Sequence, residues 1–123
     1  MNRELLERLE QFEVFTEKME QLCNEAKADA KYNDCAAFDI RFCECGGDSD
    51  IFVMPNDLFD YIELWSYVNK RYENYLENKD NEAFPNEMYF DIYANYEDIG
   101  AVFTDHTIWF EFNEDGILIK PQE

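Results

Sequence analysis

The sequence is short of glycine, proline, histidine and positive charge. Its 123 residues include four Gly, three Pro and one His. Two of the glycines, Gly46 and Gly47, are adjacent and suit a turn, so no glycine-rich loop is left to hold a phosphate. One His without a Ser or Cys motif around it does not indicate a catalytic triad. We therefore predict no catalytic residues and a protein that is not an enzyme.

Positive charge is far outnumbered by negative charge. Ten Lys and Arg residues stand against 29 Asp and Glu residues, which gives a formal net charge of −19. A net charge of about 2–8 in magnitude is enough to keep a small domain soluble, and a larger excess destabilises the compact state through self-repulsion. The acids are therefore either a solubilising coat or are directed at a basic partner. Direct nucleic-acid binding is not expected, because affinity for phosphate comes mainly from Lys and Arg.

Long hydrophobic runs are also missing. The segment 1–10 is charged from its start, which is unlike a signal peptide, and no run reaches the 18 apolar residues typical of a membrane span. We therefore expect a cytoplasmic protein that does not contact membranes. The four cysteines are then expected to be reduced thiols rather than disulfides.

Neither zinc nor calcium is indicated by the spacing of possible ligands. A structural zinc site usually shows two close pairs of ligands, whereas Cys43 and Cys45 would need Cys35 and the distant His106 to complete a set of four. The segment 111–122 imitates a calcium-binding loop, but its twelfth position is Gln122 instead of a bidentate Glu. We expect no metal and no cofactor.

The segment 3–31 has the pattern of an amphipathic helix. Its apolar residues fall on one side at helical spacing, and we interpret this side as core, with a coiled-coil dimer seam as the alternative. The apolar side comprises Leu5, Leu9, Phe12, Phe15, Met19, Leu22, Cys23 and Ala26. The opposite side comprises Glu7, Glu10, Glu13, Glu17 and Glu20.

The remaining elements are predicted from alternation and turn signals. Residues 35–55 form a β-hairpin pattern, and residues 56–77 form a second helix that Asn56 or Asp57 can cap. Four short strands are expected at 88–94, 100–103, 107–112 and 117–120. The predicted order α-ββ-α-ββββ indicates a single α+β domain over 1–123, with an antiparallel sheet of four to six strands and both helices on one face.

The segment "NEMYFDIYANYEDIG" (86–100) mixes carboxylates and rings without any cation. From residue 72 to residue 119 the chain has twelve acids and one cation, Lys79. Period-two alternation places Asp91 and Tyr93 on the outward face of a strand, where tyrosines between acids suit an interface. The predicted partner-binding residues are Glu87, Asp91, Tyr93, Tyr96, Glu97, Asp98, Glu111, Glu114 and Asp115, with Glu10, Glu13 and Glu17 as a second face.

In length, charge, acidic helix face and ring-and-acid strands, the chain resembles small acidic inhibitors of host nucleases from phages and mobile elements, namely anti-CRISPR and anti-restriction proteins. The likeness is one of composition over the whole chain and not of a motif. It implies a nucleic-acid mimic that acts in the cytoplasm of a bacterial host, where it occupies the cationic groove of a CRISPR effector or restriction complex.

Two other functions remain open from the sequence. An immunity protein that neutralises a toxin nuclease would use the same electrostatics. A structural or adaptor module would instead dimerise through the N-terminal helix, with the acids serving only solubility. The expected partner is a basic protein in the first two cases, and the chain itself is expected to be a monomer or a homodimer.

Overall fold

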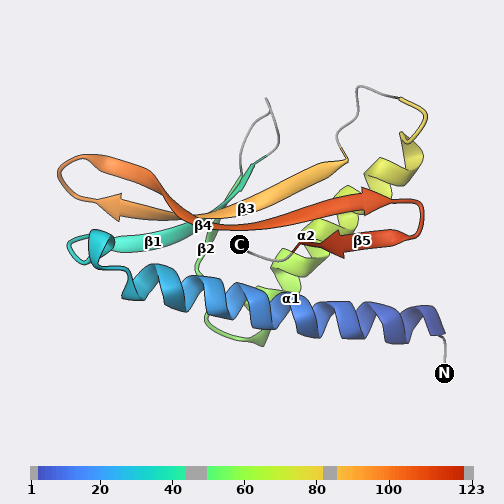
Figure 1. Cartoon of the computed structure of the whole chain (residues 1–123), viewed down its shortest axis with the longest axis horizontal. Coiled ribbons are helices and arrows are strands. Elements are labelled where there is room, and N and C mark those ends of the chain that lie inside the picture. The colour runs from blue at the N-terminus through green and yellow to red at the C-terminus, as the bar shows by residue number, and fades with distance from the viewer. Residues whose placement is uncertain (1–2, 44–49, 82–85, 121–123) are drawn as a thin grey trace.

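The computed structural model describes residues 3–43, 50–81 and 86–120. Two helices accompany one five-stranded antiparallel sheet with the strand order β2-β1-β3-β4-β5, so the α+β class is confirmed (Figure 1). The elements are α1 (Arg3–Ala28), the short 3₁₀ helix η1 (Ala30–Tyr32), β1 (Ala37–Cys43), β2 (Asp50–Val53), α2 (Leu58–Glu77), β3 (Glu87–Tyr96), β4 (Gly100–Asn113) and β5 (Gly116–Ile119).

The predicted helices and the first hairpin are confirmed. Strands β1 and β2 pair antiparallel, and the turn that was expected at 46–49 lies outside the described residues. Helix α2 begins after Asp57, whose side chain accepts a hydrogen bond from the Asp60 amide at 3.1 Å, as an N-cap does. In the described part of the chain, no helix combines the length and the apolar character needed to cross a membrane.

The predicted strand order is wrong after α2, where three strands follow instead of four. The segments 100–103 and 107–112 were expected to be separate strands. They form the single long strand β4, which pairs with β3 on one edge and with β5 on the other. The order is therefore α-ββ-α-βββ.

A bulge with an internal hydroxyl allows β4 to continue through these polar residues. The neighbours of Ile92 on β3 pair with Phe103 and Thr107, so Ile92 lies opposite three residues of β4. The buried Thr104 hydroxyl donates to the Ile92 carbonyl at 2.9 Å and accepts from the His106 amide at 3.1 Å. One side chain therefore hydrogen-bonds two backbone groups at the point where the ladder register is interrupted.

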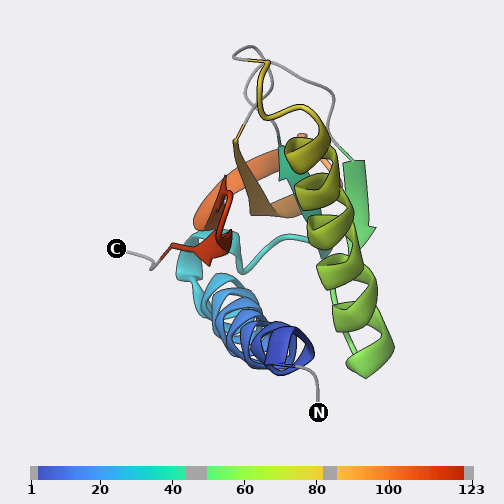
Figure 2. The same ribbon diagram turned by 90° about the vertical axis from the view of Figure 1, so that its right-hand side faces the viewer.

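The core lies between the helices and one face of the sheet. Phe15 of α1 and Trp65 of α2 stack with their centroids 5.0 Å apart, and both contact Phe110 of β4. The helices do not run side by side, since Figure 2 shows α1 nearly end-on while α2 runs across the view. The expected packing of both helices on one face therefore holds only in part. Helix α1 lies along the sheet, whereas α2 contacts it through aromatic side chains, with Tyr67 against Phe42 and Tyr72 against Phe112.

Replacing Thr104 by valine tests the bulge. Valine has nearly the same shape but no hydroxyl, so the carbonyl of Ile92 and the amide of His106 lose their partner. We expect the free energy of unfolding to fall by about 1–3 kcal/mol, as for other buried polar groups left unsatisfied. Chemical denaturation followed by circular dichroism measures this loss. Thr104→Ser keeps the hydroxyl and is the matched control, and an equal loss in both variants would show that the hydroxyl is not important.

Candidate interaction surfaces

The face of the sheet that points away from the helices is called the open face here. Its residues alternate with the core residues along each strand and are aligned in rows across the strands by the pairing register. The backbone pairing continues past β5, because the Lys120 amide donates to the Trp109 carbonyl at 2.9 Å. The open face includes Asp39, Arg41, Ile51, Val53, Glu87, Tyr89, Asp91, Tyr93, Phe103, Thr107, Trp109, Glu111, Leu118 and Lys120.

Asp91 lies on the open face, as the alternation predicts, but it does not display its carboxylate. Its exposed fraction is only 8%, so the expectation of a solvent-facing acid at this position is wrong. The Thr107 hydroxyl donates to the carboxylate, and Arg41 lies directly opposite on β1. Burial raises the pKa of Asp91, while the hydrogen bond from Thr107 and the charge of Arg41 act in the opposite direction.

Arg41 covers two of the aromatic rings on this face. Its guanidinium carbon lies 4.0 Å from the ring centroid of Tyr93 and 5.0 Å from that of Phe103, which is cation–π geometry. The guanidinium also donates to the Tyr93 hydroxyl. A second ring pair, Tyr89 and Trp109, lies one row beyond Asp91 with a centroid distance of 4.3 Å. Tyr93 is therefore part of an ordered cluster and is not a ring that stands free in solvent.

Glu87 and Glu111 share one cation of the chain. The Lys120 ammonium lies 3.2 Å from a Glu87 oxygen and 3.4 Å from a Glu111 oxygen, and these partners, Glu87 first, raise the pKa of Lys120. The Asp39 carboxylate accepts a hydrogen bond from the side-chain amide of Asn95 at 2.7 Å. Each carboxylate of the open face thus has a partner from the protein itself.

The other predicted sheet residues lie at opposite ends of β4. Glu97 and Asp98 are exposed in the turn before β4, and Glu114 and Asp115 are exposed in the turn after it. The 14 residues of β4 separate the two pairs by roughly 40 Å. Tyr96 and Glu114, both predicted partner-binding residues, have partners within the chain. The Tyr96 hydroxyl donates to the Lys31 carbonyl at 3.1 Å, and the Lys79 ammonium lies 3.5 Å from a Glu114 oxygen. The predicted acids therefore do not form one continuous patch.

The second predicted face, on α1, is continuous. Glu10, Glu13 and Glu17 are exposed, and Glu20 extends the same side of the helix by one more turn. Residues spaced by three or four on a helix lie about 5–6 Å apart, so these four residues form a row, called the glutamate row below. No ion pair among the described residues involves a member of the row.

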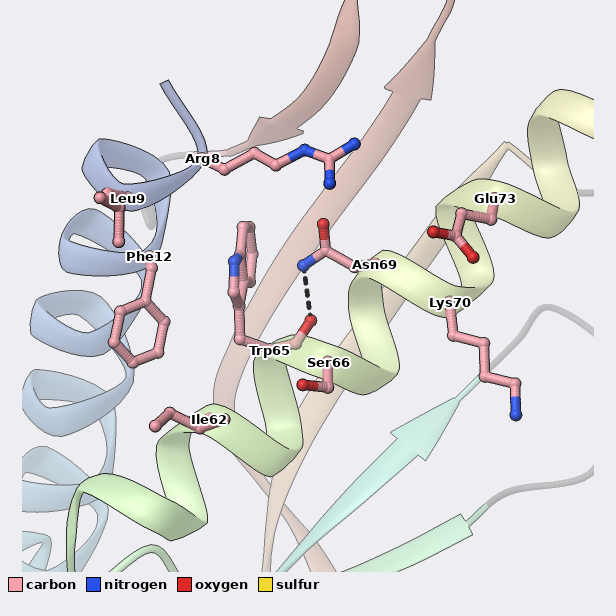
Figure 3. Close-up of a pocket in the computed structure, with 9 residues that line it drawn as sticks. All are labelled: Arg8, Leu9, Phe12, Ile62, Trp65, Ser66, Asn69, Lys70 and Glu73. Atoms are coloured by element: carbon pink, nitrogen blue, oxygen red, sulfur yellow. Dashed lines mark hydrogen bonds between the residues drawn. The ribbon is translucent and has the colours of Figure 1, made fainter. Parts of the chain in front are cut away.

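An apolar groove of about 580 Å³ lies between α1 and α2 (Figure 3). Leu9 and Phe12 line it from α1, and Ile62 and Trp65 line it from α2. Leu9 and Ile62 are both exposed, so the side of α1 that was predicted to be core is not covered at Leu9. The rim is polar and includes Arg8, whose side chain extends over Trp65 in Figure 3.

Metal binding finds no support in the described ranges. No group of three or more His, Cys, Asp and Glu side chains there is placed to hold an ion. Cys23 and Cys35 are free cysteines, and burial raises the pKa of the Cys23 thiol to about 11, so this thiol stays protonated in the core. The calcium-loop imitation is instead a β-hairpin, in which Asn113 pairs with Gly116.

The buried carboxylate of Asp91 predicts a specific pH dependence. Because its pKa is raised in the folded state, the stability it contributes is fully present below its unfolded pKa and is lost as the pH rises through its folded pKa. We expect Asp91→Asn to gain stability relative to the unmodified chain as the pH rises from acidic to neutral. Denaturant unfolding at several pH values measures this difference.

The matched variant for this experiment is Thr107→Val. It removes a hydrogen bond that favours the charged form of Asp91, so it should lose stability most at neutral pH. A pH-independent difference between Asp91→Asn and the unmodified chain would contradict the assigned state of this carboxyl.

Comparison of the chain with protein-family models, with curated proteins and with solved structures finds no match. The resemblance to small acidic nuclease inhibitors therefore stays a prediction.

Proposed function

We propose that this protein is a non-enzymatic inhibitor that binds a basic nucleic-acid enzyme of a bacterial host, such as a CRISPR effector or a restriction complex. It would occupy the cationic groove in which the enzyme holds nucleic acid. The observation that carries the proposal is the glutamate row of α1, whose exposed carboxylates take part in no ion pair among the described residues.

The row suits this role because its backbone is held in place. Phe15, Met19 and Leu22 on the opposite side of α1 are fully buried in the core, so the helix cannot rotate without exposing them. From Glu10 to Glu20 the row extends about 15 Å along the helix. A rigid line of carboxylates at spacings of about 5–6 Å presents negative charge to the Lys and Arg side chains that would otherwise contact phosphates.

The remaining acids have a supporting role in this proposal. The two turns at the ends of β4 carry exposed acids, which add to the long-range field that steers a basic partner toward the protein. The open-face acids contribute little, since each one already has a partner within the chain.

Neutralising the glutamate row tests the proposal. The variant Glu10→Gln/Glu13→Gln/Glu17→Gln should bind its target at least about tenfold more weakly at low salt, because charge complementarity is lost at the contact. Binding of the labelled protein to a panel of purified CRISPR effectors and restriction complexes is measured by fluorescence anisotropy. DNA cleavage and competition with duplex DNA are measured in parallel.

The matched control changes three glutamates on α2, in the variant Glu63→Gln/Glu73→Gln/Glu77→Gln. These side chains are also exposed and helical, so both variants carry the same net charge. The control should bind almost as well as the unmodified chain, and binding should weaken steeply with added salt. Equal losses in both variants, or binding that is insensitive to salt, would refute a role for the row.

A further inference from the structure

The open face is more apolar than a solvent-facing sheet surface requires. Antiparallel sheets usually cover the core with one face and turn polar residues to water on the other. Here Ile51 and Val53 at one edge, Phe103 in β4 and Leu118 at the other edge are all more than half exposed, with exposed fractions between 51% and 70%. Exposed apolar side chains on three strands of one sheet face indicate an interaction site.

The centre of this face has the residue types that dominate protein interfaces. Trp, Tyr and Arg carry most of the binding energy in such contacts, and the centre holds the Tyr89–Trp109 pair and the Arg41–Tyr93 pair. The rings are already ordered by these contacts, so little side-chain entropy remains to be lost when they are covered.

We propose that the open face is a self-association surface through which two copies of the chain pack face to face. Two antiparallel sheets pack in this way at a separation of about 10 Å. At about 4.8 Å between strands and 3.3 Å per residue, the five strands present about 600 Å² per copy. The pair would then bury about 1,200 Å², which is the lower limit of stable interfaces.

Charge makes the open face a poor site for a basic partner. The open face has four carboxylates and two cations, and every carboxylate has a partner within the chain. Four carboxylates against two cations give this face a net formal charge of −2, out of −19 for the chain, so a basic protein finds little of the chain's charge there. A second copy brings the same −2, a repulsion that salt screens. Packing through this face also leaves both glutamate rows outside the interface, because α1 lies on the other side of the sheet.

The proposal predicts a salt dependence opposite to that of partner binding. Each copy carries a formal charge of −19, so repulsion between the copies weakens the dimer and salt strengthens it by screening. Sedimentation velocity from about 1 to about 200 μM protein, at about 0.05 M and about 0.5 M salt, should show a dimer with at least about tenfold higher affinity at the higher salt.

Substitutions on different surfaces show which surface forms the dimer. Phe103→Asp/Leu118→Asp should be monomeric at every concentration, and Ile51→Lys/Val53→Lys on a different strand should give the same result if the first variant does not fold. Phe59→Asp is the matched control, since Phe59 is 78% exposed on α2 and is not part of the open face. Its dimer should be unchanged.

Two results would overturn the proposal. One is a monomer at both salt concentrations throughout the range. The other is a dimer that survives the open-face variants and is lost in Leu9→Asp, which would assign association to the groove between α1 and α2. Neither result bears on nuclease binding, which the α1 variants test separately.

Discussion

The positions of the few cations determine what each acidic surface of this protein can do. Arg41 and Lys120 lie on the open face, where they neutralise or approach its buried and half-buried carboxylates. The glutamate row of α1 forms no ion pair among the described residues. Two surfaces with similar numbers of acids therefore differ in character: on one the carboxylates have partners within the chain and lie among rings, and on the other the carboxylates are exposed and form no ion pair among the described residues.

An aromatic core allows the chain to tolerate this charge. Phe15, Trp65, Phe90 and Phe110 contact one another or share neighbours across both helices and the sheet. Such rings bury large areas and add specific contacts, which offset the self-repulsion of a chain with a net charge of −19. Burial of these rings against one face of the sheet thus contributes the stability that charge repulsion among the acids reduces.

Local patterns were enough to predict most elements, and pairing information was needed for the rest. The spacing of apolar residues identified α1 and α2, and alternation placed Asp91 and Tyr93 on the outward face. The same alternation cannot reveal that Arg41 lies opposite Asp91, because the register between β1 and β3 is set by distant parts of the chain. The continuity of β4 was missed for a related reason, since Thr104 has its role only when Ile92 lies beside it.

The sheet separates two surfaces that differ in chemistry, and this arrangement has a consequence for valency. A face-to-face pair would carry its two α1 helices on opposite outer sides, so the assembly could engage two binding sites at once. If those sites belonged to one oligomeric enzyme, the second contact would form at a high effective concentration and avidity would exceed the affinity of either contact alone. A protein with modest affinity at each site could then hold a multisubunit target for long periods.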